Sequence, residues 1–421
     1  MPHLPEFPPS SLPAILKSKE KGNEAYSKAQ FSTALTEYSR GLSHFKTSST
    51  PPSPTNVIDS KNAGDPVVLL TSLLSNRSAT YTHLRKYTEA LKDADEVVGA
   101  RPTWVKGFFR RGEALQGLRR HTEALEQYEI ALQKDPKSGS IGVKIARIKA
   151  ILEDASKGLV IHQLLPGRDL CSKSLLAPIQ NLIFDYAIQM RNFIYVIENV
   201  ASREALVVDA CWDVDGILKY CANEKLTIVG ALVTHYHFDH VGGIPPPPFD
   251  QYRVRVDGLA KLLKKLHNIK AYVNPLDIPE IIKSNPELSE SRFAPTEDNG
   301  HLSLPFSNSG EGARDGGTTT LLEFIHSPGH TPGSQCVLVN GERLLSGDTL
   351  FIGSCGRLDF PDSDKVRMFA SLMKLGRLKG EVVVYPGHDY GGEMTTIETE
   401  KRTGTLRPRS EADFLAEFSH D

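Results

Sequence analysis

Residues 232–243 read Leu-Val-Thr-His-Tyr-His-Phe-Asp-His-Val-Gly-Gly, so three histidines and an aspartate directly follow an apolar segment. In an extended chain successive side chains alternate in direction, so His235 and His237 would point the same way. Asp239 and His240 come next and can turn toward a second centre. The stretch offers more metal-binding groups than one ion needs. It therefore predicts a metal site in a loop that follows a strand.

Three more residues of ligand type end apolar segments further along the chain. His330 ends TLLEFIHSPGH, Asp348 ends SQCVLVNGERLLSGD, and His388 ends VVVYPGH. Helical stretches are expected between the apolar segments, at 211–224, 257–268 and 277–284. This alternation predicts an α/β sandwich whose strand-end loops hold the site. Seven nitrogen and oxygen ligands suit two divalent metal ions.

The order HxHxDH, followed by His, Asp and His, resembles the signature of the metallo-β-lactamase superfamily. The resemblance implies an αββα sandwich and two divalent ions, with zinc expected and iron or manganese as alternatives. The implied ligands are His235, His237 and His330 for the first ion, Asp239, His240 and His388 for the second, and Asp348 as the bridge. The implied catalytic residues, which activate water for hydrolysis, are His235, His237, Asp239 and Asp348. Asp209 is expected to brace the loop without binding metal.

Two segments, SGDTLFIGSCGRLDFP (346–361) and YPGHDYG (385–391), most resemble the glyoxalase II, or hydroxyacylglutathione hydrolase, group. Those enzymes hydrolyse thioesters of glutathione. The resemblance places Arg357 near the substrate, where a cation would suit a peptide carboxylate. A structural role for Arg357 in its loop is the alternative. The interval between His240 and His330 is longer than is usual in that group.

Two other functions stay open. GRLDF (356–360) and TIETEKRTGTLRPR (396–409) also resemble persulfide dioxygenases, which hold a single iron through the counterparts of His235, His330 and Asp348. The alternative of another class is a co-chaperone adaptor with an inert metal domain. A domain that no longer binds metal has no physical reason to keep seven clustered residues of ligand type, so their presence favours an enzyme.

The N-terminal part of the chain repeats with a period of 34 residues. Ala90 and Ala124 are 34 residues apart, as are Pro102 and Pro136, and AQFSTALTEYSRGL (29–42) supplies an earlier copy. The pattern resembles tetratricopeptide repeats, in which helix hairpins pack small residues against aromatic ones. We therefore predict an all-α domain of three repeats with a capping helix at 141–155.

The predicted domain limits follow from these patterns. A stretch rich in Pro, Ser and Asn interrupts the repeats and predicts a loop insertion. The expected parts are a disordered segment at 1–14, the repeat domain at 15–157 with its insertion at 45–67, the metallo-β-lactamase-like domain at 160–400, and a C-terminal tail at 401–421.

Five polar residues occupy matching positions on the expected first helices of the repeats. They are Lys19, Asn23, Asn76, Lys106 and Arg110. Residues four apart share a helix face, so all five can point into one groove. They resemble the carboxylate clamp of co-chaperone repeats, which grips the acidic C-terminal tail of Hsp70 or Hsp90. Amides and cations are apt partners for a terminal carboxylate and an Asp side chain.

Composition limits the compartment and the partners. Residues 1–155 carry 22 Lys+Arg against 17 Asp+Glu, and the remainder carries 27 against 34. The small basic excess of residues 1–155 suits an acidic partner, but it is too small for binding to nucleic acid. We expect no membrane span and no signal peptide, since neither a long apolar run nor a basic leader is present. Five dispersed cysteines fit a reducing compartment, so a cytoplasmic protein is expected.

Overall fold

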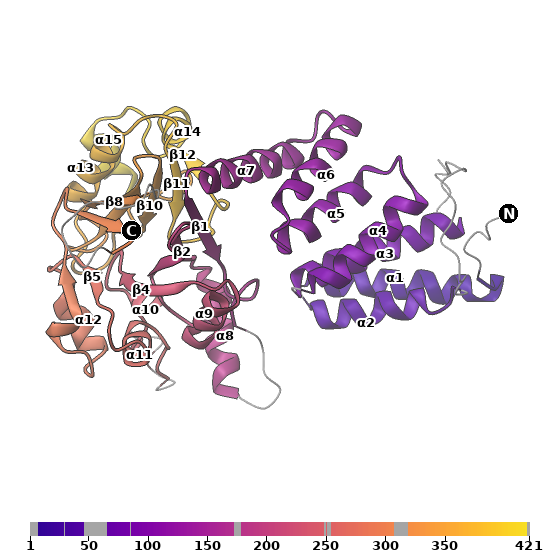
Figure 1. Cartoon of the computed structure of the whole chain (residues 1–421), viewed down its shortest axis with the longest axis horizontal. Coiled ribbons are helices and arrows are strands. Elements are labelled where there is room, and N and C mark those ends of the chain that lie inside the picture. The colour runs from indigo at the N-terminus through magenta and orange to yellow at the C-terminus, as the bar shows by residue number, and fades with distance from the viewer. Residues whose placement is uncertain are drawn as a thin grey trace. The chain divides into compact units, whose positions relative to one another are not determined.

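The computed structural model describes residues 7–28, 30–45, 65–84, 86–171, 178–247, 250, 254–306 and 319–418. The chain divides into two compact units, Met1–Asp154 and Ala155–Asp421. Each unit contains its own clusters of buried apolar side chains. The expected order, a helical region followed by an α/β region, is confirmed (Figure 1).

The first unit consists of consecutive helix pairs followed by one further helix, α7 (Gly139–Ser156), at the place predicted for the cap (Figure 1). The pairs are α1 (Leu12–Ser27) with α2 (Phe31–Leu42), α3 (Pro66–His83) with α4 (Tyr87–Ala100), and α5 (Val105–Gly117) with α6 (His121–Lys134).

Close contacts between a glycine and a tyrosine explain how the first and third pairs pack. A Cβ atom at Gly22 would lie 2.5 Å from the Tyr38 ring, and one at Gly112 would lie 2.6 Å from the Tyr128 ring. Only glycine therefore lets the two helices of each pair come so close. Ser78 lies 34 residues before Gly112 and is fully buried, with its hydroxyl donating to the carbonyl of Ala90. The sequence period thus corresponds to a repeated packing contact.

Two predicted limits in this unit need correction. A short 3-10 turn, η1 (Pro9–Ser11), leads into α1 at Leu12, so part of the segment expected to be disordered is structured. The expected insertion at 45–67 ends sooner, because the Asp65 side chain accepts hydrogen bonds from the Val67 and Val68 amides and caps α3. Side-chain caps of this kind define a helix start. Residues 1–6 and 46–64 of these two predictions lie outside the described residues.

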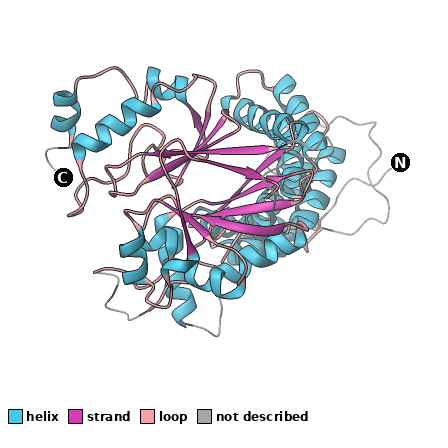
Figure 2. Cartoon of the chain, turned by 60° about the vertical axis from the view of Figure 1, so that its left-hand side comes forward, coloured by secondary structure: helices cyan, strands magenta, loops and turns pink. Residues whose placement is uncertain are grey.

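Two six-stranded sheets form the centre of the second unit (Figure 2). The first contains, in order, β1 (Leu159–Leu164), β2 (Ile194–Asn199), β3 (Glu204–Val208), β4 (Thr227–Leu232), β5 (Ala271–Val273) and β6 (Phe293–Pro295). The second contains β12 (Thr395–Thr396), β11 (Val383–Pro386), β10 (Arg343–Gly347), β9 (Gln335–Val339), β8 (Thr320–His326) and β7 (His301–Leu304).

Strand β3 shows how the layers are built. Leu206 and Val208 join a cluster with residues of the second sheet such as Val337, whereas Ala205 and Val207 join the cluster beneath the helices. Successive strand residues point to opposite faces, so a strand apolar at every position is buried on both sides. The result is the expected order of helix layer, sheet, sheet and helix layer.

Helices cover the outer face of each sheet. Those that contribute to the cluster on the first sheet are α8 (Pro178–Met190), α9 (Val214–Asn223), α11 (Leu259–Lys265) and α12 (Ile278–Ser284). Those on the second are α13 (Lys365–Leu375), α14 (Ile397–Arg402) and α15 (Glu411–Glu417). Two short elements complete the unit, α10 (Phe238–Val241) and η3 (Glu290–Arg292). Among the described residues, no helix has both the length and the apolar character needed to cross a bilayer.

The last helix corrects the prediction of a C-terminal tail at 401–421. Ser410 caps α15 through a capping box with Asp413. Phe414 is fully buried, and its ring lies 5.5 Å from that of Phe369 on α13. Residues 401–418 therefore belong to the second unit, and residues 419–421 lie outside the described part of the chain.

Replacing Phe414 should test how strongly α15 supports the second unit. Phe414→Ala would leave a cavity, so we expect a loss of about 3–5 kcal/mol in the free energy of unfolding. Urea unfolding followed by Trp212 fluorescence, in a Trp104→Phe background, measures this unit alone. Val366→Ala on α13, where the side chain is half exposed, is the control and should change stability by less than about 0.5 kcal/mol. Equal midpoints for the two variants would contradict the packing described for α15.

Candidate metal centre and peptide groove

The seven predicted ligands lie together at the ends of strands of both sheets, and all of them are buried except His237, which is partly buried. His235 and His237 follow β4 and His330 follows β8; Asp348 comes directly after β10, and His388 follows β11 after one glycine. The side-chain atoms form three overlapping groups, each with mutual distances within 4.8 Å. The groups are His235, His237 and His330; His235, His240 and Asp348; and Asp239, His240 and His388.

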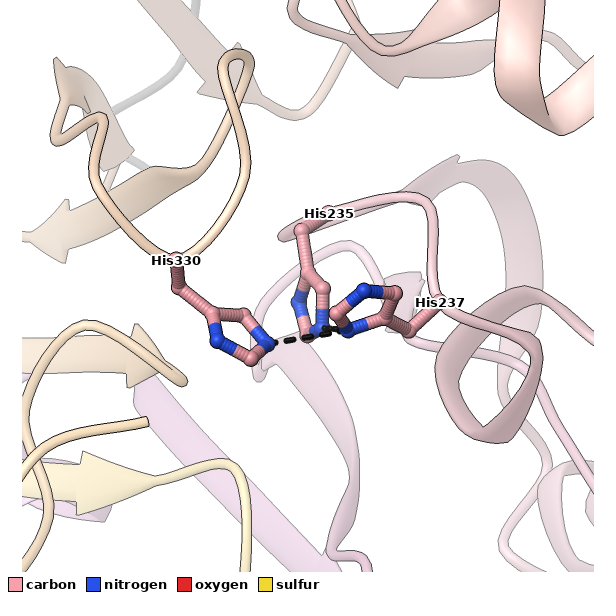
Figure 3. Close-up of side chains that lie close together, drawn as sticks. All are labelled: His235, His237 and His330. Atoms are coloured by element: carbon pink, nitrogen blue, oxygen red, sulfur yellow. Dashed lines mark hydrogen bonds between the residues drawn. The ribbon is translucent and has the colours of Figure 1, made fainter. Parts of the chain in front are cut away.

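The first set of three histidines is close enough to share one ion. Nδ1 of His237 lies 3.1 Å from Nε2 of His235 and 2.9 Å from Nε2 of His330 (Figure 3). Two of the side chains come from one loop and the third from a loop of the opposite sheet. These three residues, called the first group below, match the ligand set predicted for the first metal.

The second group consists of Asp239, His240 and His388. Nε2 of His240 lies 3.2 Å from Nε2 of His388. Oδ2 of Asp239 lies 3.7 Å from the first of these nitrogens and 3.6 Å from the second. The turn of α10 makes this possible, since it redirects the chain after His237.

Asp348 lies between the two groups. Its Oδ2 atom is 3.5 Å from Nε2 of His330 and 3.3 Å from Nε2 of His388. Its Oδ1 atom is buried and accepts no hydrogen bond. Leaving a buried carboxylate oxygen unsatisfied is costly, and a divalent cation would satisfy it. The imidazole and carboxylate set therefore fits the divalent metals that this fold implies.

Hydrogen bonds on the far side of three rings fix which nitrogen faces the centre. Nδ1 of His330 donates to the carbonyl of Arg357 at 2.8 Å, and Nδ1 of His388 donates to that of Met190 at 2.7 Å. Nδ1 of His240 lies 2.9 Å from a carboxylate oxygen of Asp209. Each bond leaves Nε2 directed inward, as in metal sites whose histidines are oriented by outer partners.

Asp209 takes the bracing position expected from the sequence. Besides His240, its carboxylate accepts hydrogen bonds from the amide and the hydroxyl of Thr234, at 2.8 and 2.7 Å. Its backbone φ of 53° is unusual for a residue other than glycine. The carboxylate therefore holds the start of the ligand loop and one ring of the second group.

The histidines of the two groups differ in their pKa values in the metal-free protein. Burial opposes protonation of His240, but the nearby carboxylates, Asp348 first among them, outweigh it and raise its pKa to about 10. The same balance raises the pKa of His388. In the first group burial dominates, and it lowers the pKa of His237 to about 3. Neutral imidazoles are thus ready to bind a cation in the first group, whereas a cation that enters the second group must displace the proton of His240.

Two supporting residues were missed by the sequence analysis. Asn192 is buried, and its amide Nδ2 lies 2.9 Å from Oδ2 of Asp239. Asp277 is buried and accepts hydrogen bonds from the amides of Tyr236 and Gly333 and from the hydroxyl of Thr331. It therefore ties together the two loops that carry the first group. The only sequence signals were a polar residue directly before an apolar strand and an acidic residue before a short helix.

Arg357 is placed differently from the other candidates. Its side chain is 70% exposed and pairs with Asp359, and its guanidinium lies over the Phe360 ring at 4.8 Å. Its carbonyl, not its side chain, contacts the centre through His330. Both the substrate-binding and the loop-stabilising readings of Arg357 therefore stay predictions. His326 lies outside both groups, with Nε2 2.9 Å from the carbonyl of Pro332.

The predicted peptide groove also gathers its residues. Asn23 on α1 accepts hydrogen bonds from Nδ2 of Asn76 on α3, at 2.9 Å, and from the hydroxyl of Tyr38, at 2.8 Å. Nζ of Lys106 on α5 donates to Oδ1 of Asn76 at 3.3 Å. Three repeats thus contribute to one connected row of polar side chains.

Two further cations, Lys19 and Arg110, lie close enough to this row to act on the charge of Lys106. Burial lowers the pKa of the Lys106 ammonium group, and the charges of Arg110 and Lys19 lower it further. Arg110 pairs with Glu113 at 2.5 Å, while its Nε atom is buried without a hydrogen-bond partner. Crowded cations with an unsatisfied donor favour an incoming anion.

Comparison with known proteins agrees with this geometry. Residues 189–246 and 258–388 match the model of the metallo-beta-lactamase superfamily. The probable polyketide biosynthesis zinc-dependent hydrolase PksB of Bacillus subtilis (strain 168) is 26% identical over 201 residues, which are 48% of this chain and 74% of that protein. The hydroxyacylglutathione hydrolase of Pseudoalteromonas translucida (strain TAC 125) is 30% identical over 203 residues, 47% of this chain. The match spans 61% of that hydrolase, so the similarity covers less than two thirds of its length.

The helical unit is similar to solved repeat domains. The first TPR of Spaghetti (RPAP3), bound to the HSP90 peptide SRMEEVD, aligns with a TM-score of 0.28 and 24% identity, over 34% of this chain and 95% of that one. The match to the metallo-beta-lactamase superfamily lies within the second unit, and glyoxalase II enzymes are among the relatives of this part of the chain. The metallo-β-lactamase resemblance inferred from the sequence is confirmed by this match, and the consecutive helix pairs of the first unit agree with the repeats that the sequence predicts.

Metal affinity should rise with pH. Ligand nitrogens must be deprotonated to bind metal, so a cation that enters the second group displaces protons from His240 and His388. Below the raised pKa of His240, the dissociation constant should fall by up to about tenfold per pH unit for each proton released. Chelator competition at pH 6.5, 7.5 and 8.5, with proton release read by an indicator dye, measures this effect. His240→Gln should flatten the dependence, and a wild-type dissociation constant independent of pH would contradict the charge assignment.

Proposed function

We propose that the second unit is a metal-dependent hydrolase that cleaves a thioester of the acyl-glutathione type. The observation that carries the proposal is the complete set of two ligand groups joined by Asp348, with an unsatisfied buried oxygen between them. Glyoxalase II homologues among the relatives support the thioester class. Zinc is the proposed metal, since histidine-rich sites with carboxylates suit it.

In the proposed reaction, the metal ions would lower the pKa of water and polarise the thioester carbonyl. The chain's own residues orient that chemistry. His235, His237 and His330 would hold one ion and the second group the other, and Asp348, which lies between the groups, would be available to both. Aromatic rings border the site, with Phe360 4.9 Å from His237 and Tyr390 stacked on His388 at 4.6 Å. These rings would limit the access of bulk water, which strengthens electrostatic interactions inside the site.

A single-iron oxygenase is the alternative enzyme. It would use His235, His330 and Asp348 and would leave the second group without a role. The second group is buried and braced by Asp209 and Met190 as firmly as the first. This equal support fits a hydrolase that uses both groups, although the ligand residues by themselves are common to both classes of enzyme.

For the first unit we propose a carboxylate clamp that binds the acidic C-terminal tail of Hsp70 or Hsp90. The row from Asn23 to Lys106, with Lys19 and Arg110 beside it, supports the proposal. Amide donors and cations can satisfy both a chain-terminal carboxylate and an aspartate side chain. Such a tether would keep the enzyme near chaperones, and cysteines that are all thiols fit the proposed cytoplasmic location.

Thiol release from lactoylglutathione, with zinc or iron supplied, tests the enzyme. We expect turnover by the wild type and a loss of about 100-fold or more in Asp239→Asn, since weaker metal support alone costs 10- to 100-fold. His326→Gln, outside both ligand groups, is the control and should keep wild-type turnover. Oxygen consumption with a persulfide, and no thiol release, would instead establish the dioxygenase. Neither activity in metal-loaded protein would favour the adaptor.

Peptide affinity tests the clamp. Lys106→Glu should weaken binding of the peptide SRMEEVD at least about tenfold, because a charge-assisted hydrogen bond is worth about 1.5–3 kcal/mol and the new carboxylate repels the tail. Fluorescence anisotropy of the labelled peptide measures the change. Lys92→Glu, the same charge reversal at an exposed residue of α4, is the matched control. Equal affinities for the wild type and Lys106→Glu would refute the clamp, as would equal binding of a peptide with an amidated C-terminus.

A further inference from the structure

Asn192 lies where the chain enters β2, directly opposite His388. The amide of Phe193 donates to the carbonyl of Gly387 at 2.8 Å, and the amide of Asp389 donates to the carbonyl of Arg191 at 3.0 Å. These bonds form a short antiparallel bridge in which Asn192 pairs with His388. Asn192 is only 1% exposed. Its side chain is therefore fixed in depth and direction by the main chain on both sides.

Trp212 decides which end of the Asn192 amide faces the centre. Nε1 of the indole donates to Oδ1 of Asn192 at 3.1 Å. An indole N–H is a donor only, so the amide oxygen has to face it. The Nδ2 group, with its two hydrogens, is thereby turned toward the metal ligands.

All three side chains that Nδ2 meets there belong to the second group. Oδ2 of Asp239 lies at 2.9 Å, Nε2 of His240 at 3.2 Å and Nε2 of His388 at 3.4 Å. An imidazole nitrogen that carries a proton or holds a metal has no lone pair available to accept a hydrogen bond from Nδ2. Asp239 then remains as the acceptor among the three.

We propose that Asn192, oriented by Trp212, is a positioning residue for the second metal ion, which it secures by holding the carboxylate of Asp239 against His240 and His388. The inference rests on the proposed binding of two metals but not on the identity of the substrate. A free carboxylate rotates, and restraining it before the ion arrives lowers the cost of binding. The first group has its own supports, so the effect of Asn192 falls on one ion of the two.

Stepwise metal titration separates the two groups. Metal-free wild-type protein is titrated with Zn²⁺ or Co²⁺ against a competing chelator, and the same is done for Asn192→Ala, Trp212→Phe and the double variant. His237→Ala, which lacks a first-group side chain, identifies which binding phase belongs to which group. Asn199→Ala is the matched control, because Asn199 is equally buried and hydrogen-bonded, to Leu304 and Thr320, at the opposite end of β2.

We expect two ions per wild-type chain and, in Asn192→Ala, a 10- to 100-fold weaker second-group phase with the first-group phase unchanged, the range seen when a supporting partner is lost. Trp212→Phe should weaken the same phase by less, and the double variant should resemble Asn192→Ala, because both act through one amide. Asn199→Ala should leave both phases unchanged.

Three results would overturn the inference. They are an unchanged second-group phase in Asn192→Ala, an equal weakening of both phases, and fully additive effects of the two substitutions. A wild-type protein that binds fewer than two ions would overturn the two-metal proposal as well, so the two failures are distinguishable.

Discussion

Charge burial is the constraint on which the second unit depends. Asp239 and Asp348 lie almost out of reach of water among five imidazoles, and one oxygen of Asp348 lacks any hydrogen bond. An ionised carboxylate in such surroundings is stable only beside positive charge. In the metal-free protein the protonated His240 supplies it, and divalent ions would do so in the loaded protein. The hydrogen bonds that the ring Nδ1 atoms donate to Asp209, Met190 and Arg357 keep the rings turned toward that charge.

Much of the site could be predicted because its ligands stand at fixed places in the sequence. Each predicted ligand follows an apolar strand, and strand-end loops of a sandwich meet at one edge, so order along the chain indicated proximity. The repeat domain could be predicted for a similar reason, since a 34-residue period places Asn23, Asn76 and Lys106 on equivalent helices. Periodicity and spacing are properties that a single sequence retains.

Other features depend on contacts that no local pattern records. Asn192 meets Asp239 only because the segment 191–193 runs beside 387–389, and Asp277 reaches two loops far from it in the chain. The prediction of a C-terminal tail at 401–421 failed for a different reason. Ser410 and Asp413 form a capping box that was visible in the sequence, but α15 is too short for periodicity to stand out. Burial of Phe414, a tertiary effect, decides that this segment folds onto α13.

The ligands are divided between the two sheets. Asp239, His240 and their neighbours follow β4 in one, while His330, Asp348 and His388 follow strands of the other. An ion held among them is thus a cross-link between the halves of the sandwich, and its binding free energy is added to that of folding. By mass action this contribution grows as RT ln(1 + [metal]/Kd), about 2.7 kcal/mol when the free metal exceeds Kd 100-fold. The free energy of unfolding of this unit would therefore rise and fall with the concentration of free metal around it. When the ion is scarce, the junction between the two sheets, where catalysis is proposed, would be less stable.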